Sequence, residues 1–286
     1  MITATAATTI TIGQALEEAR ARLAHLESAR LDADILLAAV LDCRREDFYA
    51  RPERELPANR AVDFHALIER RSEGYPVAYL TGRREFWSLQ CQVNSHTLIP
   101  RPETETLVEA ALARIPEETA LDILDLGTGS GAIALALAGE RPACRITATD
   151  ISREALAVAY ENANAAGLSN IAFMESDWFS ELERQRYHLI VSNPPYVESN
   201  YGGFATGEIR FEPRLALDGG PAGLDAIRRI IPAARRRLHP GGWLLLEHGH
   251  QQAEDTRGLL LAARYSDPQT LQDMAGLDRV TLAYAS

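Results

Sequence analysis

The sequence lacks the features that mark secreted and membrane proteins. Its 286 residues hold only three cysteines, which are too few and too widely spaced for a disulfide framework or a metal cluster. No apolar run approaches the roughly 18 residues that a membrane span needs. Residues 1–14 lack the basic and apolar stretches of a signal peptide. These absences predict a cytoplasmic protein that holds no metal and does not contact a membrane.

Positive charge is also scarce. Lysine and arginine together number 29 against 40 acidic residues, which gives a formal net charge of −11. Because duplex nucleic acid is bound largely by neutralising its phosphates, this balance disfavours a general nucleic-acid binder. The arginines within 228–237 have helical spacing, which is typical of a solvated helix face rather than a phosphate track.

Glycine is missing from residues 14–73, where alanine, leucine, glutamate and arginine dominate. Apolar residues recur at steps of three and four over 12–26, which predicts an amphipathic helix. The stretches 31–41 and 61–71 predict two more. We therefore expect residues 1–83 to form a small all-helical domain.

A connecting segment follows this domain. Apolar and polar residues alternate over Trp87–Val93, as in a half-buried strand. Residues 94–96 have turn chemistry, and Thr97–Ile99 are the candidate partner strand. In Pro100–Glu105, prolines followed by acidic residues predict a helix start. The sequence thus predicts a β-hairpin linker over residues 84–104.

From Leu121 onward, short apolar segments alternate with helical ones, most clearly at 153–166 and 224–238. Such alternation predicts an α/β domain over residues 105–286, with a mostly parallel sheet and helices on both faces. The segments with the length and composition of strands are Leu121–Leu126, Arg145–Asp150, Ile171–Glu175, His188–Ser192, Trp243–Glu247 and Val280–Tyr284.

The first of these strands runs into a glycine-rich turn, Gly127-Thr128-Gly129-Ser130-Gly131, after which a helix begins. Glycines allow the backbone to approach a ligand without a clashing Cβ. Asp150 ends the next strand, where a carboxylate can accept hydrogen bonds from both ribose hydroxyls. The turn and the acid together predict a site for a cofactor that contains a nucleoside.

Two classes of cofactor fit this turn. Gly127, Gly129 and Ala132 satisfy the GxGxxG/A dinucleotide fingerprint, which would indicate a dehydrogenase. The third glycine lies at GxGxG spacing, however, and Asp125 comes two residues before the turn. A carboxylate there suits a cationic ligand tail, such as the amino group of S-adenosylmethionine, better than a pyrophosphate. A glycine turn needed only for packing is the remaining alternative.

The sharpest signal is Asn193-Pro194-Pro195-Tyr196, directly after the apolar strand 188–192. Ligands bind at the carboxyl ends of strands in an open parallel sheet, so this turn is expected to face the glycine turn. Proline fixes the backbone and removes amide donors, which leaves rigid carbonyls free to accept. The alternative is an ordinary turn at the end of a strand.

Such a turn suits methyl transfer to a planar nitrogen, whose delocalised lone pair makes it a poor nucleophile. If the Asn193 side-chain oxygen and the Pro194 carbonyl each accept one N–H, they orient the nitrogen and stabilise the positive charge that develops on it. Tyr196 is expected to pack on the planar face of the substrate. No strong general base is required, and none is nominated.

Weaker signals follow two other strands. Asp177 is expected to accept from an adenine amino group and Trp178 to pack on the ring, and the alternative is a capping aspartate with a core tryptophan. His248 and His250 lack a third and fourth metal ligand at any usual spacing, so they are expected to be ordinary residues at a strand end.

The Asn-Pro-Pro-Tyr turn and several further segments resemble one family, the HemK/PrmC release factor glutamine methyltransferases. The likeness runs from about Ala29 to the C-terminus and includes linker and later motifs at Pro76–Gly82, Phe86–Trp87, Thr97–Glu105, Glu212–Leu217 and Leu246–Gly249. Glu103 departs from the family pattern, where aspartate is frequent, and so does His250, where an aromatic residue is expected.

The resemblance implies a seven-stranded Rossmann-like methyltransferase domain, preceded by a helical domain for substrate recognition. It also implies S-adenosyl-L-methionine as cofactor and, as acceptor, the glutamine of a Gly-Gly-Gln motif in peptide-chain release factors. The positions that it assigns to the cofactor are Gly127–Gly131, Asp150, Trp178 and Asn193, and those that it assigns to the glutamine are Asn193–Tyr196.

Rival functions share elements of this pattern. A glutamine methyltransferase of a ribosomal protein would have the same active-site residues. An adenine-amino DNA methyltransferase also presents a planar amine to such a turn, but the acidic charge and the lack of a target-recognition region disfavour it. A module that binds the cofactor without catalysis is disfavoured by the intact Asn193–Tyr196 turn.

Overall fold

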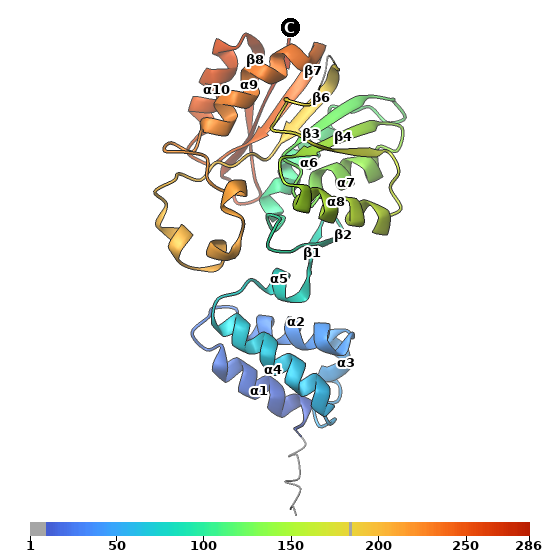
Figure 1. The fold of residues 1–286 in the computed structure, drawn as a ribbon, viewed down its shortest axis with the longest axis vertical. Coiled ribbons are helices and arrows are strands. Elements are labelled where there is room, and N and C mark those ends of the chain that lie inside the picture. The colour runs from blue at the N-terminus through green and yellow to red at the C-terminus, as the bar shows by residue number, and fades with distance from the viewer. Residues whose placement is uncertain (1–9, 183–184) are drawn as a thin grey trace, which may run out of the picture. The chain divides into compact units, whose positions relative to one another are not determined.

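The computed structural model describes residues 10–182 and 185–286. The first nine residues of the predicted helical domain lie outside the described residues. The chain divides into two compact units, Met1–Gly82 and Arg83–Ser286 (Figure 1). No helix within the described ranges is long and apolar enough to cross a membrane.

The first unit is helical, as the sequence predicts. Its helices are α1 (Ile12–Arg22), α2 (Ala29–Leu41), α3 (Arg45–Tyr49), α4 (Ala58–Ser72) and α5 (Val77–Thr81). Leu23, Leu36 and Phe64 are almost fully buried in its core. The two five-residue helices have too few turns to show an apolar period, so the sequence pattern did not reveal them.

The start of α1 and the contact between α2 and α4 both depend on polar side chains. Thr11 and Gln14 form a capping box that satisfies backbone amides at the start of α1. Inside the unit, Nε of Arg71 on α4 lies 2.7 Å from Oδ2 of Asp32 on α2, and both side chains are buried. Breaking a buried ion pair leaves an uncompensated charge, so this pair favours one packing of the two helices.

The second unit contains a seven-stranded sheet in the order β5-β4-β3-β6-β7-β9-β8 (Figure 1). The strands are β3 (Asp122–Leu126), β4 (Arg145–Asp150), β5 (Ile171–Glu175), β6 (Tyr187–Ser192), β7 (Leu238–Glu247), β8 (Tyr265–Gln272) and β9 (Asp278–Ala285). Pairing is parallel from β5 through β7, and β9 is antiparallel to both of its neighbours. This is the predicted Rossmann-like sheet.

Helices cover both faces of the sheet. They are α6 (Glu105–Leu112), α7 (Ala132–Glu140), α8 (Arg153–Ala165), α9 (Asp225–Arg237) and α10 (Ala253–Ala262). Successive strand residues point to opposite faces. Thus Ile123 belongs to the apolar cluster that contains α6 and α7, whereas Leu124 belongs to the cluster that contains α9. Each face therefore has its own apolar core.

Strand β8 of the sheet was not predicted from the sequence. Strand β8 contains Asp267, whose φ is +48°, and Pro268, and its pairing with β9 shifts register between Ser266 and Gln269. These features break the alternation that identifies a strand. They are tolerated because β8 lies at the edge of the sheet, where a proline costs no ladder hydrogen bond.

The hairpin prediction was wrong in its partner strand. Strand β2 (Leu89–Gln92) pairs with β1 (Arg83–Phe86), not with Thr97–Ile99. Trp87 and Ser88 have φ of +52° and +59° and form the turn rather than the start of a strand. The signal was weak because neither residue is typical of such a turn.

Asn162 of α8 holds the hairpin against the glycine turn that follows β3. Its Oδ1 accepts from the amide of Gln92 at 2.7 Å, while its Nδ2 donates to the carbonyls of Gln92 and Ser130 at 3.0 and 2.9 Å. Because the side chain is buried, these bonds are costly to lose. One asparagine therefore connects the linker with the glycine turn.

Candidate active site

The site lies where the strand order reverses. Strands β3 and β6 are neighbours at the centre of the sheet, with Leu126 opposite Ser192, and Oγ of Ser192 donates to the Leu126 carbonyl at 2.7 Å. The turns that follow these strands therefore open side by side. Ligands bind at such a switch point in open α/β sheets.

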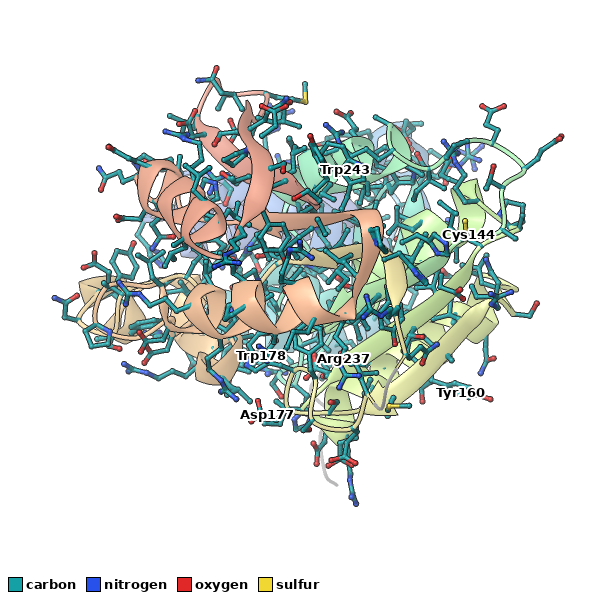
Figure 2. The ribbon with its side chains drawn as sticks, turned by 90° about the horizontal axis from the view of Figure 1, so that it is seen from above. Cys144, Tyr160, Asp177, Trp178, Arg237 and Trp243 are labelled. Atoms are coloured by element: carbon teal, nitrogen blue, oxygen red, sulfur yellow. The ribbon has the colours of Figure 1, made fainter. Side chains whose placement is uncertain are left out.

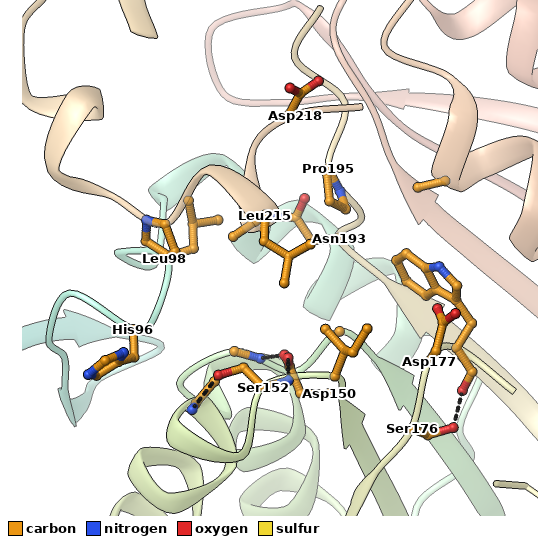
Figure 3. Close-up of a pocket in the computed structure, with 18 of the residues that line it drawn as sticks. His96, Leu98, Asp150, Ser152, Ser176, Asp177, Asn193, Pro195, Leu215 and Asp218 are labelled. Atoms are coloured by element: carbon orange, nitrogen blue, oxygen red, sulfur yellow. Dashed lines mark hydrogen bonds between the residues drawn. The ribbon is translucent and has the colours of Figure 1, made fainter. Parts of the chain in front are cut away.

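A cavity of about 410 Å³ occupies this end of the sheet (Figure 3). The loops after β3, β4, β5 and β6 all contribute to its wall. The predicted site residues that line it are Gly127, Gly129, Asp150, Asp177, Trp178, Asn193 and Pro195. The remaining predicted residues do not line it; they are Asp125, Thr128, Ser130, Gly131, Pro194 and Tyr196.

Glycine is required at two positions of the turn for different reasons. Gly129 has φ of +56°, a conformation that side chains disfavour, and its amide donates to Oδ2 of Asp150 at 2.8 Å. At Gly131 a Cβ atom would lie 3.1 Å from Cβ of Ala159 on α8. Gly129 thus allows the backbone of the turn to line the cavity, whereas Gly131 allows the start of α7 to pack against α8.

Asp125 is buried directly under the glycine turn. Its Oδ2 accepts from Oγ1 of Thr128 at 2.6 Å, but its Oδ1 has no hydrogen-bond partner in the described ranges of the chain. Burial raises the pKa of this carboxyl group to about 7. A buried carboxyl oxygen without a partner fits a cationic group of a ligand, as the sequence pattern indicated.

Asp150 ends β4 and faces the cavity with both oxygens anchored (Figure 3). Oδ2 accepts from the Gly129 amide at 2.8 Å, and Oδ1 accepts from the Ser152 amide at 2.9 Å. Burial raises the pKa of Asp150, while these amides act in the opposite direction. The carboxylate is thus held in one orientation, with further lone pairs for ligand hydroxyls.

Asp177 and Trp178 follow β5 and lie next to each other at the cavity (Figure 2). Oδ2 of Asp177 accepts from Arg229 of α9 at 2.9 Å, and both side chains are exposed. Trp178 has φ of +54°, and its ring lies 3.7 Å from where a Cβ of Gly127 would be. The tryptophan is therefore packed against the glycine turn, whereas the aspartate is engaged in a surface ion pair.

The side chain of Asn193 has a defined orientation at the cavity wall. Its Nδ2 donates to Oγ1 of Thr104 at 3.1 Å. Across residues 10–182 and 185–286 no group donates to its Oδ1. The amide is thereby oriented with its acceptor oxygen available, as the proposed chemistry requires.

Tyr196 is half-buried and does not line the cavity. Its hydroxyl donates to Oε1 of the buried Glu247, at the end of β7, at 3.1 Å. Burial raises the pKa of Tyr196, so its phenol stays protonated. Packing of its ring on a substrate stays a prediction.

The backbone that supports the Asn-Pro-Pro-Tyr turn was missed by sequence analysis. A Cβ on Gly219 would lie 2.7 Å from the Pro195 carbonyl oxygen and 2.8 Å from Cα of Tyr196. Gln252, at the start of α10, donates to the Tyr196 carbonyl at 3.0 Å. The Gly219-Gly220 pair is visible in the sequence, but its contact with the turn is not.

Two of the motifs that carried the family resemblance meet at the cavity. Oε2 of Glu212 accepts from the Ile99 amide at 3.0 Å, and Oε1 pairs with Arg101. Leu98 and Leu215, which flank these contacts, line the cavity. Leu215 is 62% exposed, which places an apolar side chain at the rim.

The histidines at the end of β7 have no ligand-binding role that the structure reveals. His248 is buried, and its ring nitrogens lie 2.9 Å from the Gly249 carbonyl and 2.7 Å from Oγ1 of Thr281. Burial lowers its pKa. In the described ranges no group of three or more histidine, cysteine or acidic residues could hold a metal ion.

Solved structures share the fold of the second unit. A crystal structure of a methyltransferase from Pyrococcus furiosus is 20% identical, with a TM-score of 0.52, over 68% of this chain and 88% of that chain. A T. thermophilus 16S rRNA methyltransferase in complex with AdoMet and guanosine is 22% identical, with a TM-score of 0.51, over 71% of this chain and 50% of that chain. At these identities the likeness concerns the fold alone.

The sheet, the glycine turn and its carboxylates define an S-adenosylmethionine-dependent methyltransferase. Residues 104–208 match the methyltransferase small domain, and residues 14–82 match the PrmC N-terminal domain. The release factor glutamine methyltransferase from Xylella fastidiosa is 48% identical over 88% of this chain and 92% of its own length. The one from Escherichia coli is 48% identical over 93% of this chain and 96% of its own length. The chain belongs to the release factor glutamine methyltransferase family.

Proposed function

We propose that this enzyme methylates the side-chain amide nitrogen of the glutamine in the Gly-Gly-Gln motif of peptide-chain release factors. The observation that supports it most directly is the orientation of Asn193, whose Nδ2 is engaged by Thr104 while Oδ1 is available at the cavity. The names of the curated relatives point to the same substrate. The place of action that we propose is the cytoplasm, where translation terminates.

The residues around the cavity fit S-adenosylmethionine. Asp150 would hold the ribose hydroxyls, Asp125 would face the cationic amino group behind Gly127–Gly131, and Trp178 would pack beside the adenine. When bound, the cofactor supplies an electrophilic methyl group on a sulfonium. Asp177 would face the adenine end with Oδ1, since only its Oδ2 accepts from Arg229.

The Asn193–Tyr196 turn would hold the glutamine. Oδ1 of Asn193 and the Pro194 carbonyl each accept one N–H of the amide, which aligns its nitrogen and stabilises positive charge on it. Gly219 and Gln252 keep the backbone of this turn in place. The proton that leaves the methylated nitrogen passes to solvent, so no side chain is assigned as a base.

The domain division that we propose assigns a separate task to each segment. Residues 1–83 recognise the protein substrate, residues 84–104 form the linker, and residues 105–286 bind the cofactor and the glutamine. No direct contact with nucleic acid is proposed, in keeping with the net charge of −11.

A single labelling experiment separates this function from its rivals. The enzyme would be incubated with methyl-labelled cofactor and, in separate reactions, with purified release factors, ribosomal proteins and DNA. We expect label on the release factor and none in a variant whose Gly-Gly-Gln glutamine is replaced by alanine. Label on a ribosomal protein or on DNA instead would replace the proposal with the corresponding rival.

Replacing Asp150 with alanine is expected to weaken binding of S-adenosylhomocysteine by about 1.5–2 kcal/mol. This lies at the lower end of the range for hydrogen bonds to a charged group, because Gly129 and Ser152 already occupy some of the carboxylate lone pairs. Calorimetric titration would measure the change. Unaltered affinity, or tight binding of NADH in place of S-adenosylhomocysteine, would contradict the cofactor site.

Replacing Gly219 with alanine is expected to push the backbone of Pro195 and Tyr196 out of place. The added Cβ meets backbone atoms at 2.7–2.8 Å, so the chain must shift. We expect turnover to fall about tenfold and unfolding free energy to fall by about 1–3 kcal/mol. Gly139→Ala is the matched control, since its Cβ meets nothing within 4 Å in the described structure. Equal kinetics for both variants would refute the supporting role of Gly219.

A further inference from the structure

Glu212 is a buried carboxylate that joins the loop after the Asn-Pro-Pro-Tyr turn to the linker. Its side chain is only 1% exposed, although most of the loop over residues 198–217 is exposed or half-buried. Oε2 accepts from the Ile99 amide at 3.0 Å, and Oε1 pairs with Arg101. An amide side chain would set its own NH2 group against one of these donors, so a carboxylate is needed to satisfy both.

The loop that carries Glu212 begins directly after the Asn-Pro-Pro-Tyr turn and returns to it. The Val197 amide donates to the Leu217 carbonyl at 2.9 Å, and the Gly219 amide donates to the Val197 carbonyl at 2.8 Å. These bonds close the base of the loop, while Glu212 attaches its body to the linker. Leu98 of the linker and Leu215 of the loop both line the cavity (Figure 3). The contact made by Glu212 therefore belongs to the surroundings of the site.

The linker is stiff between the contacts of Glu212 and Thr104. Pro100 and Pro102 have fixed φ angles, and each also restricts the residue before it. Arg101 is accordingly extended, with φ of −100° and ψ of 141°. Its carbonyl accepts from the Thr104 amide at 3.1 Å. A displacement at Arg101 is therefore transmitted to Thr104 instead of being absorbed by the linker.

Thr104 determines which end of the Asn193 amide faces the cavity. Its buried Oγ1 accepts from Nδ2 of Asn193 at 3.1 Å. The two ends of an amide have nearly the same shape but opposite hydrogen-bonding character. Without this acceptor the amide can turn over and present Nδ2, a donor, to the N–H groups of the glutamine. Catalysis thus depends on the position of Thr104.

We propose that Glu212 is a positioning residue for methyl transfer, which holds the linker so that Thr104 keeps Oδ1 of Asn193 directed at the substrate. Each link in this chain is a hydrogen bond or an ion pair between identified atoms. Glu212 does not line the cavity, so it does not touch the substrate and takes no proton from it. The inference rests on the proposed function of the Asn193–Tyr196 turn.

The first measurement is kcat on release factor for the full-length enzyme and for Glu212→Gln. The substitution keeps the size of the side chain but opposes one of its donors, so kcat should fall about tenfold through misplacement of Asn193. The KM for S-adenosylmethionine should change by less than about twofold, because Asp150 and the glycine turn keep their contacts. Titration with S-adenosylhomocysteine counts the folded enzyme, so unfolded protein does not lower kcat. Glu198→Gln, the same change at an exposed position of the same loop, is the matched control and should keep the normal kcat.

The second measurement is a double-mutant cycle with Thr104. Thr104→Val removes the acceptor for Asn193 but keeps the shape, so it should lower kcat by a similar factor, and Thr104→Ser should restore it. If Glu212 acts through Thr104, combining Glu212→Gln with Thr104→Val should lower kcat no more than about twofold below the lower single variant. Residues that support the site independently would instead give losses that multiply to about 100-fold.

A substitute variant keeps the cycle usable if Glu212→Gln does not fold. Arg101→Met removes the partner of Oε1 and leaves the Ile99 amide bonded to Oε2. It should show the same dependence on Thr104. Normal kcat for Glu212→Gln, or losses that multiply in the double variant, would overturn the inference.

A Thr104→Val enzyme with normal kcat would also overturn it, because the last link in the chain would then have no effect on methyl transfer. If the unaltered enzyme did not methylate release factor while still binding S-adenosylhomocysteine, the proposed function would be at fault instead.

Discussion

Replacing Asn193 with alanine is expected to lower kcat roughly 100-fold or more, as for loss of a preorganised acceptor in an active site. The substitution removes Oδ1, which is available at the cavity wall, and with it one of the two acceptors that we propose for the glutamine amide. Binding of S-adenosylhomocysteine should stay within a few-fold, because Asp150, Asp125 and the glycine turn are unchanged.

Turnover with labelled cofactor and calorimetric titration would check both expectations. Asn164→Ala is the matched control, since it deletes the same side chain at an exposed position of α8. An Asn193→Ala enzyme with near-normal turnover would refute the assigned role. A large loss of cofactor affinity instead would mean that Asn193 serves mainly to bind the cofactor.

Removing residues 1–82 is expected to lower kcat/KM on intact release factor by roughly 100-fold while sparing cofactor affinity. Every residue that lines the cavity lies from Ser95 onward. The second unit also has its own apolar cores on both faces of the sheet. Binding energy from regions of a substrate far from the reacting atom positions that atom, so its loss reduces the rate of transfer.

Two comparisons make the truncation informative. Thermal melting of Arg83–Ser286 would establish that the unit is folded before its kinetics are measured. A short peptide that contains Gly-Gly-Gln should be a poor substrate for both forms, with similar kcat/KM, because it lacks the remote contacts. A truncated enzyme that methylates full-length release factor at the normal kcat/KM would exclude recognition by the helical unit.

Local patterns in the sequence were sufficient to predict the α/β sheet and most of its strands. The glycine turn, Asp150 and the Asn-Pro-Pro-Tyr turn each follow a strand, and the rule that ligands bind at the carboxyl ends of parallel strands predicted that they meet. The structure brings Gly129, Asp150 and Asn193 to one cavity. Elements with little periodicity, such as β8 and the short helices α3 and α5, were not predicted from the sequence.

The sequence by itself determined the class of fold and the cofactor, and it predicted the residues nearest the chemistry, because these depend on short motifs with fixed spacing. Only the tertiary structure decided what supports them. Thr104, Gly219 and Glu247 are distant from Asn193 in the chain yet lie behind the same turn. Their roles depend on backbone contact and burial, and the raised pKa of Glu247 arises mainly because the fold removes water from it.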